Sequence, residues 1–217
     1  MSYDAIVFDI DGTLWDARES ITAGWNLAIE EITGIPGTLE SETFGQLFGK
    51  PLDALIDFAF PGVPPERKAV LGDYCLRREN EVLLERPGAL YPGVEETLEK
   101  LMARYPLFIV SNCGKGYIEA MLQGTGLRPY FCSWLCYADT NAPKDVTLGV
   151  LKKQCRLKNP VYVGDIQADA DACAKAGVDI IYAAYGFGTI QRPAATIHRF
   201  PDLLTLDLLW RWYDAPI

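Results

Sequence analysis

The sequence is poor in histidine, because His198 is the single imidazole among 217 residues. A metal site with several histidine ligands is therefore excluded, and a histidine-based catalytic triad would have to use this residue. His198 stands in the segment Ala195-Thr-Ile-His-Arg-Phe-Pro201 near the end of the chain, where a surface or strand-end role is expected. The chemistry must therefore be sought among the carboxylates.

Patterned cysteines and long apolar runs are also lacking. The six cysteines are scattered and include no Cys-x-x-Cys pair, so neither a disulfide framework nor a zinc site is predicted. No stretch approaches the roughly 20 apolar residues of a membrane-spanning helix. The N-terminal apolar run lacks a basic start and ends at Asp9, unlike a signal peptide. We expect a cytoplasmic protein with reduced thiols.

Positive charge is scarce, since 20 Lys and Arg residues face 29 Asp and Glu residues and give a formal net charge of −9. Such a chain has few cations with which to neutralise a run of phosphates. We therefore expect neither a nucleic acid nor an anionic membrane as partner, although a local positive pocket for one phosphate stays compatible with this charge. No pattern indicates an oligomeric state.

Short apolar runs alternate with helix-like stretches along most of the chain. Residues 4–9 are typical of a short buried strand, which is followed by a turn signal at Asp11-Gly12. Similar strand-like runs follow at residues 107–111, 160–164 and 178–182, and helix-like stretches at 114–123, 144–155 and 167–176. This alternation predicts an α/β fold with a Rossmann-like parallel sheet core covered by helices on both faces.

Residues 17–88 follow a different pattern, with apolar residues at helical spacing and no convincing strand. We expect a small helical domain inserted after the first strand. The predicted α/β core then contains residues 1–16 and 89–217, and the predicted helical domain contains residues 17–88. Trp15 and Trp25 are candidates for an entrance to the site, with core packing favoured for Trp25.

Polar residues follow three of the predicted strands. Open parallel sheets form their sites at the carboxyl ends of the strands, so these residues are candidates for one site. The candidates are Asp9 and Asp11 after the first strand, Ser111 and Asn112 at the second, Asp165 and Asp169 after the third, and Lys144 on a helix between the last two. Together they suit a hard cation with oxygen ligands and a bound phosphate.

The segment Asp9-Ile-Asp-Gly-Thr-Leu-Trp-Asp16 is the most specific pattern. One of its carboxylates can act as a nucleophile toward phosphorus, and another can give a proton to the leaving oxygen and take one from water. Gly12 allows a sharp turn that brings N–H groups close to a phosphate, and Thr13 adds a hydroxyl donor. A lone Asp-Gly would indicate an ordinary turn, but a buried strand followed by this longer pattern favours catalysis.

The other candidates have structural alternatives. Asp165 at a strand end can bind a metal, and Asp169 four residues later would share its face, or the pair can cap a helix and form its acidic first turn. Ser111 can cap the next helix or help to bind an anion there. Lys144 can neutralise the charge of a phosphate, with Lys115 as a lower-ranked rival.

Four motifs follow one another along the chain: Asp9-Ile-Asp-Gly-Thr-Leu, Ser111, Lys144, and Gly164-Asp165 with Asp169. They resemble the motifs of the haloacid dehalogenase-like hydrolase superfamily. Within it, they resemble the phosphatase branch with a helical cap, to which phosphoglycolate phosphatases and β-phosphoglucomutases belong. The resemblance extends from residue 4 to about residue 185. It departs from the family at Pro143-Lys144-Asp145, where many relatives have Lys-Pro. Residues 17–88 fall where this branch carries its cap.

The resemblance implies a mechanism that depends on Mg²⁺. Asp9 would attack phosphorus to form an aspartyl-phosphate, while Asp11 acts first as an acid and then as a base. The implied metal ligands are Asp9, the Asp11 backbone carbonyl and Asp165, with Asp169 supporting the metal shell or pairing with Lys144. The implied phosphate-binding residues are Thr13, Ser111, Asn112 and Lys144.

We therefore expect a phosphatase for a small phosphate monoester such as phosphoglycolate, a sugar phosphate or a nucleotide. A phosphomutase of the β-phosphoglucomutase type and a non-catalytic binding protein on the same scaffold are the alternatives. A dehalogenase is disfavoured, because related dehalogenases lack the carboxylate found here at Asp11. Lys50 lies in a segment that resembles a substrate-facing cap loop, although a solvated lysine before a helix is the alternative there.

Overall fold

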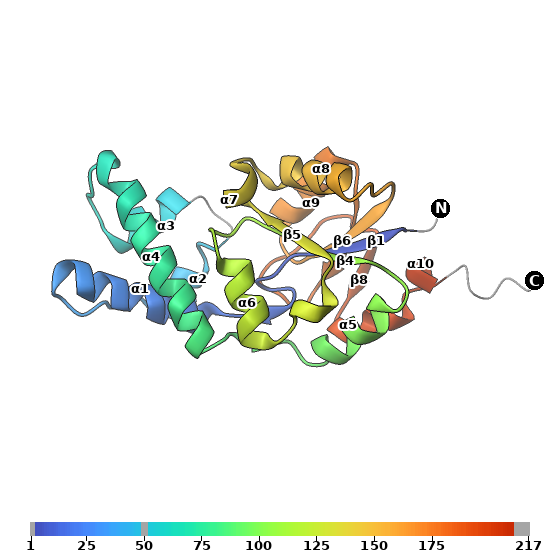
Figure 1. Ribbon diagram of the computed structural model, residues 1–217, viewed down its shortest axis with the longest axis horizontal. Helices are drawn as coiled ribbons and strands as arrows, with labels where there is room; N and C mark the ends of the chain where they lie inside the picture. The colour runs from blue at the N-terminus through green and yellow to red at the C-terminus, as the bar shows by residue number, and fades with distance from the viewer. Residues whose placement is uncertain (1–2, 49–51, 211–217) are drawn as a thin grey trace, which may run out of the picture. The chain divides into compact units, whose positions relative to one another are not determined.

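A computed structural model provides the structure of the protein and describes residues 3–48 and 52–210. The predicted α/β fold is confirmed, since six parallel strands form one sheet in the order β5-β4-β1-β6-β7-β8 (Figure 1). The strands are β1 (Ala5–Phe8), β4 (Leu107–Ser111), β5 (Ser133–Cys136), β6 (Pro160–Gly164), β7 (Asp179–Ala183) and β8 (Ala195–Ile197).

The central strands are apolar because both of their faces are covered. Every residue of β1, β4 and β6 is buried, as expected for parallel strands with helices on both sides. Val7 and Tyr162 belong to the core on the side of α8 (Lys144–Gln154) and α9 (Gln167–Ala176). Phe8 alternates to the other face, where its ring centroid lies 5.7 Å from that of Phe200.

Helices on the opposite face from α8 and α9 complete the layers (Figure 1). They are α5 (Val94–Met102), the 3₁₀ helix η2 (Phe200–Thr205) and α10 (Asp207–Trp210), with η1 (Arg128–Tyr130) and α7 (Tyr137–Thr140) as short elements before and after β5. Two edge strands, β5 and β8, are not predicted by the apolar runs. Both are only partly buried. β8 has three residues, and β5 (Ser-Trp-Leu-Cys) contains none of the β-branched residues that every central strand has.

The described residues group into two compact units. The α/β unit contains the described parts of Met1–Trp15, Leu90–Asn112 and Leu127–Ile217, and the helical unit contains those of Asp16–Ala89 and Cys113–Gly126. The short strands β2 (Trp15–Asp16) and β3 (Ala89–Leu90) form a separate two-stranded sheet. The division into a core of residues 1–16 and 89–217 and a helical domain of residues 17–88 stays a prediction.

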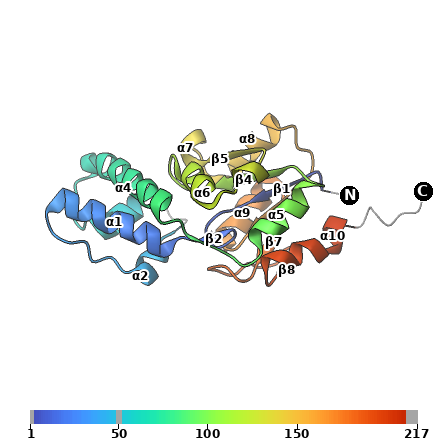
Figure 2. The same ribbon diagram turned by 60° about the horizontal axis from the view of Figure 1, so that its bottom comes forward.

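The helical unit is built around α4 (Pro65–Glu85), which packs against α1 (Arg18–Thr33) (Figure 2). The two helices approach closely at Gly24, where a Cβ atom would lie 2.7 Å from Glu79 Cα. The other helices of this unit are α2 (Ser41–Gly45), α3 (Leu52–Ala59) and α6 (Tyr117–Thr125). None of the described helices combines the length and the apolar character needed to traverse a bilayer.

Candidate active site

The carboxyl ends of three adjacent strands position the candidate residues. In the sheet, β1 lies between β4 and β6. Asp9 directly follows β1, Ser111 is the last residue of β4, and Asp165 directly follows β6. One shared site requires these three strands to be neighbours in the sheet, and the structure shows that they are. Their polar ends lie on one edge of the α/β unit.

Three of the candidate carboxylates form a buried cluster. Asp9, Asp165 and Asp169 each offer an oxygen that lies within 4.8 Å of the others. Lys144 joins this cluster from the first turn of α8, with its Nζ 3.0 Å from Asp9 Oδ2 and 2.6 Å from Asp169 Oδ1. The Lys144 side chain is only 5% exposed, whereas the rival Lys115 is exposed.

Asp169 organises the loop that follows β6. Its Oδ2 accepts hydrogen bonds from the backbone N–H groups of Asp165 and Ile166, both at 3.2 Å, and its Oδ1 accepts one from Lys144. This carboxylate thus accepts the N–H groups at the start of α9 and pairs with Lys144 at the same time. Helix capping and the pairing with Lys144, which the sequence left as alternatives, are therefore both present.

The cluster carries an excess of negative charge in a buried place. Burial, and next the charge of Asp9, raise the pKa of Asp165 to about 8. Burial raises the pKa of Asp9 to about 6, although Lys144 opposes that shift. For Lys144, burial lowers the pKa, but the charges of Asp169 and Asp9 outweigh it and raise the pKa above its usual value.

The donor set of this cluster fits a divalent cation such as Mg²⁺. With all groups ionised, three carboxylates and one ammonium leave two negative charges, which one divalent ion would balance. The ligands on offer are carboxylate oxygens, which such hard cations prefer. In addition, the buried Asp9 Oδ1 accepts no hydrogen bond from any described residue, so it is an orphaned oxygen that a cation or a phosphate group would satisfy.

The loop after Asp9 is held by its own backbone. The Ile10 carbonyl accepts hydrogen bonds from the N–H groups of Thr13, Leu14 and Trp15 at 3.1, 2.8 and 3.3 Å. Gly12 has a φ of +77°, and a Cβ atom there would lie 2.1 Å from Asp165 Oδ2. A glycine is thus required both by the turn and by the close approach to the next carboxylate.

The predicted phosphate-binding residues differ in burial. Thr13 is fully buried, and its Oγ1 lies 3.5 Å from Asp165 Oδ1. Ser111 is buried at the end of β4, and Asn112 beside it is exposed. Gly116 is the N-cap residue of α6, so the alternative in which Ser111 caps the next helix is wrong.

The remaining predictions concern one lysine, two tryptophans and the histidine. Lys50 lies outside the described residues, so its role stays a prediction. Trp15 and Trp25 are both fully buried, which confirms core packing for Trp25 and contradicts an entrance-lining place for Trp15 in this structure. His198 is exposed and directly follows β8, as its place in the sequence predicts.

The loop after β7 also contributes to the site, and the candidate residues did not include it. Phe187 N–H donates a hydrogen bond to Asp165 Oδ2 at 2.7 Å, and Tyr185 Oη donates one to the Thr13 carbonyl at 2.7 Å. A Cβ atom on Gly186 would lie 2.3 Å from the Gly12 carbonyl oxygen. The glycines of Tyr185-Gly-Phe-Gly188 after the fourth predicted strand are the signal that could have found this loop.

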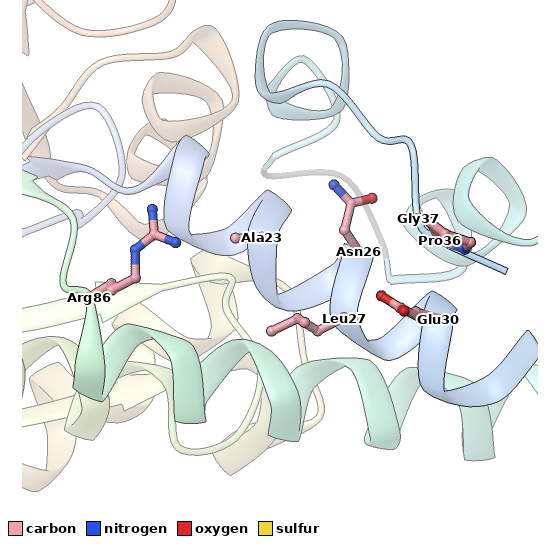
Figure 3. Close-up of a pocket in the computed structure, with 7 residues that line it drawn as sticks. All are labelled: Ala23, Asn26, Leu27, Glu30, Pro36, Gly37 and Arg86. Carbon is pink, nitrogen blue, oxygen red and sulfur yellow. The ribbon is translucent and has the colours of Figure 1, made fainter. Parts of the chain in front are cut away.

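A surface cavity of about 330 Å³ lies in the helical unit and contains none of the predicted site residues (Figure 3). Its polar groups are largely engaged or solvated, since the Asn26 side chain makes hydrogen bonds of 3.0 and 2.8 Å to the Leu39 backbone, and Glu30 and Arg86 are exposed. Its lining residues are Ala23, Asn26, Leu27, Glu30, Pro36, Gly37 and Arg86.

The fold and the strand-end carboxylates define a class of hydrolase. The chain belongs to the haloacid dehalogenase-like hydrolase family, whose sequence model matches residues 6–183. This match confirms the resemblance found in the motifs. It also confirms the prediction that the protein is a hydrolase, and the relatives described next include phosphatases.

Relatives and solved structures agree with this family. The chain is 27% identical to a phosphoglycolate phosphatase of Mesorhizobium japonicum, in a match that covers 99% of both chains. It is also 27% identical to the pyrophosphatase PpaX of Bacillus velezensis, over 92% of this chain and 94% of that protein. The crystal structure of a predicted phosphoglycolate phosphatase from Haemophilus somnus matches with a TM-score of 0.77 and 24% identity, covering 94% and 98% of the two chains.

Proposed function

We propose that the chain is a magnesium-dependent phosphatase that hydrolyses a small phosphate monoester through an aspartyl-phosphate on Asp9. The environment of Asp9 is the observation that carries this proposal. Its Oδ2 pairs with Lys144 at 3.0 Å, whereas its buried Oδ1 has no hydrogen-bond donor among the described residues. Such a carboxylate is oriented by one oxygen and has the other available for a reacting group or an ion.

The proposed metal ligands are the carboxylates of Asp9 and Asp165 and the backbone carbonyl of Asp11, with Asp169 supporting the shell from its place beside Lys144. A bound Mg²⁺ ion would screen the repulsion between an anionic nucleophile and an anionic substrate and stabilise charge on the phosphoryl oxygens. The hydrogen bond from Phe187 N–H holds Asp165 in position, which is the kind of support that tunes a ligand.

The proposed phosphate-binding groups are Thr13, Ser111, Asn112 and Lys144. Lys144 supplies a buried positive charge next to Asp9, where a transferring phosphoryl group would develop its negative charge. Ser111 is buried at the end of the adjacent strand, so its hydroxyl belongs to the same edge of the sheet.

The first chemical step transfers the phosphoryl group to the protein. An oxygen of the Asp9 carboxylate forms a bond to phosphorus, while the bond between phosphorus and the leaving oxygen breaks and its electron pair stays with that oxygen. The Asp11 carboxyl group gives its proton to the leaving oxygen, so the product departs as a neutral alcohol.

The second step restores the enzyme. A water molecule attacks the phosphorus of the aspartyl-phosphate, and Asp11, now ionised, takes a proton from this water. The bond between phosphorus and the Asp9 oxygen breaks, which releases inorganic phosphate and the Asp9 carboxylate. The sum is one phosphate monoester and one water converted into one alcohol and one inorganic phosphate.

Phosphoglycolate is the first substrate to test, since a relative that matches over nearly the whole chain is a phosphoglycolate phosphatase. Pyrophosphate is the second, because another relative is a pyrophosphatase. Sugar phosphates and nucleotides complete the panel. Cytoplasmic location and the absence of nucleic-acid or membrane partners remain expectations from the sequence.

The test is the variant Asp9→Asn, assayed with p-nitrophenyl phosphate and the metabolite panel in the presence of Mg²⁺. Loss of a nucleophile that works in a coupled site lowers kcat by about 10⁴-fold or more. The thermal unfolding temperature should stay within a few degrees of the wild type or rise, because one buried carboxylate charge is removed. Substantial turnover by this variant would remove Asp9 from the nucleophile role.

Product analysis separates the proposed phosphatase from the alternatives. Release of inorganic phosphate from a sugar phosphate supports hydrolysis, whereas an isomeric sugar phosphate would indicate a mutase. A folded wild-type protein without Mg²⁺-dependent turnover of any compound in the panel would favour the non-catalytic binding protein.

A further inference from the structure

The proposed acid and base, Asp11, has a neighbour of an unusual kind. The Trp15 indole Nε1–H donates a hydrogen bond to Asp11 Oδ1 at 3.0 Å. Trp15 lies four residues after Asp11, as the first residue of β2, and its side chain is fully buried in the protein. A large rigid group that donates to this carboxylate is therefore part of the site.

The backbone of the loop after Asp9 fixes the indole. Gly12 N–H donates to the Trp15 carbonyl at 3.0 Å, and Trp15 N–H donates to the Ile10 carbonyl at 3.3 Å. A β-bridge links Asp11 and Trp15, so the residue that carries the carboxylate and the residue that carries the donor are held together. Because the indole is fully buried, it has little freedom to leave its place.

We propose that Trp15 is a positioning residue, whose indole N–H holds the Asp11 carboxyl group in the orientation needed for proton transfer. The inference rests on the proposed function, in which Asp11 protonates the leaving oxygen. It gives a role in proton transfer to Trp15, which the sequence predicts only as a residue at an entrance to the site.

The chemistry of the indole also assigns the two oxygens of Asp11 to different tasks. An indole N–H is a donor and never an acceptor, so Oδ1 of Asp11 must be the accepting oxygen in this pair. In a protonated carboxyl group the carbonyl oxygen is the better acceptor, so this hydrogen bond favours the form that carries its proton on Oδ2. Oδ2 gives this proton to the leaving oxygen in the first step and receives one from water in the second.

The experiment compares two aryl phosphates that differ in how much their leaving groups need a proton. Phenolate is a basic leaving group and requires protonation, whereas 2,4-dinitrophenolate departs without it. In Trp15→Phe, kcat/KM for phenyl phosphate should fall by about tenfold or more, since general acid catalysis contributes about 10²–10⁴-fold. The value for 2,4-dinitrophenyl phosphate should change by less than about threefold, because its first step needs no acid.

A matched control lies in the helical unit. Trp25 is also fully buried, and its indole Nε1–H donates to Glu79 Oε2 at 2.6 Å. Trp25→Phe therefore removes the same kind of hydrogen bond at a place outside the carboxylate cluster. Any loss of kcat/KM in this variant should be equal for the two aryl phosphates.

A second readout follows the phosphorylated enzyme. With 2,4-dinitrophenyl phosphate, Trp15→Phe should accumulate more aspartyl-phosphate at steady state than the wild type does, because Asp11 is also the base of the second step. Acid quenching and phosphate analysis of the denatured protein measure this fraction. Replacement of Trp15 by 3-benzothienylalanine, which keeps the shape and lacks the N–H, should give the same result if Trp15→Phe folds poorly.

Asp11→Asn and Asp9→Asn separate the possible failures. An equal loss for both aryl phosphates in the Trp15 variants, with a strong preference for 2,4-dinitrophenyl phosphate in Asp11→Asn, would overturn the inference and leave the proposed function intact. If Asp11→Asn itself has no such preference, or if Asp9→Asn stays active, the proposed function fails first.

Discussion

The two compact units differ in their buried charged side chains: the α/β unit has a cluster of them, and the described part of the helical unit has one. In the α/β unit, Asp9, Lys144, Asp165 and Asp169 lie together at the strand ends. In the described part of the helical unit, Glu79 is the one buried charged side chain, and it accepts a 2.6 Å hydrogen bond from Trp25.

The two units differ in how they compensate for buried charge. Burial of like charges raises the free energy of the folded state, so a cluster of three carboxylates persists only with compensation. Lys144 compensates in part, and a bound cation would complete the compensation. Glu79 is a single charge with a specific donor, which is a common way for a helix pair to satisfy a buried polar group. Substitutions in each of the two units test this difference.

The largest effect is expected for Asp165→Asn, which removes a proposed metal ligand from the cluster. Activity with Mg²⁺ should fall by at least about 100-fold, because even groups that only support a ligand cost 10- to 100-fold. Mg²⁺ at 100 times its Kd should stabilise the wild type by about 2.7 kcal/mol. The variant should lose most of this gain, as measured by thermal unfolding with Mg²⁺ and with EDTA. An equal Mg²⁺ stabilisation in both proteins would contradict the metal site.

Gly186→Ala should have the next largest effect. Its Cβ atom would lie 2.3 Å from the Gly12 carbonyl oxygen and 2.4 Å from Asp165 Cβ, so the loop after β7 or the loop after β1 must move. Overpacking of this kind costs about 1–3 kcal/mol of stability. The same loop contains Phe187, whose N–H donates to Asp165. The value of kcat should therefore fall even when it is calculated per folded molecule. A variant that keeps full kcat would show that the position of this loop is unimportant for the reaction.

The site illustrates what the sequence can and cannot predict. The buried strands β1, β4, β6 and β7 are short apolar runs, so their places along the chain and their polar ends could be read directly. Their order in the sheet is known only from the structure. Asp9 and Asp165 were predicted because strand ends in a parallel sheet meet at one edge. Asp169 was predicted because it lies four residues after Asp165, in the first turn of a helix. These inferences depend on residue type and on local pattern, which a sequence contains.

Other parts of the site depend on backbone geometry. Phe187 acts on Asp165 through its N–H group, which every residue except proline has, so its residue type carries no signal. The roles of Gly186 and Trp15 come from close approaches that only the folded chain defines. The edge strand β5 (Ser-Trp-Leu-Cys) was missed because it is short and lacks the β-branched residues by which the central strands were predicted.

A smaller effect is expected for Glu79→Ala in the helical unit. The substitution leaves the buried Trp25 indole N–H without its carboxylate acceptor, which costs about 1–3 kcal/mol. Chemical denaturation should therefore show a lower free energy of unfolding, while kcat per folded molecule stays near that of the wild type. Glu79→Gln keeps an acceptor oxygen and should recover part of the loss. A large fall in kcat without a fall in stability would give Glu79 a role in the reaction and end the contrast between the two units.

The smallest effect is expected for Gly149→Ala, on the exposed side of α8. A Cβ atom at this position meets nothing within 4 Å, so the added methyl group causes no clash. Alanine is favoured over glycine inside a helix by about 0.8–1.0 kcal/mol, and the free energy of unfolding should rise by about that amount. The same helix carries Lys144 in its first turn, so an unchanged kcat would indicate that the scaffold of the α/β unit can be stabilised without disturbing the cluster. A fall in stability would instead show that α8 needs glycine at position 149, even though the space around it is open.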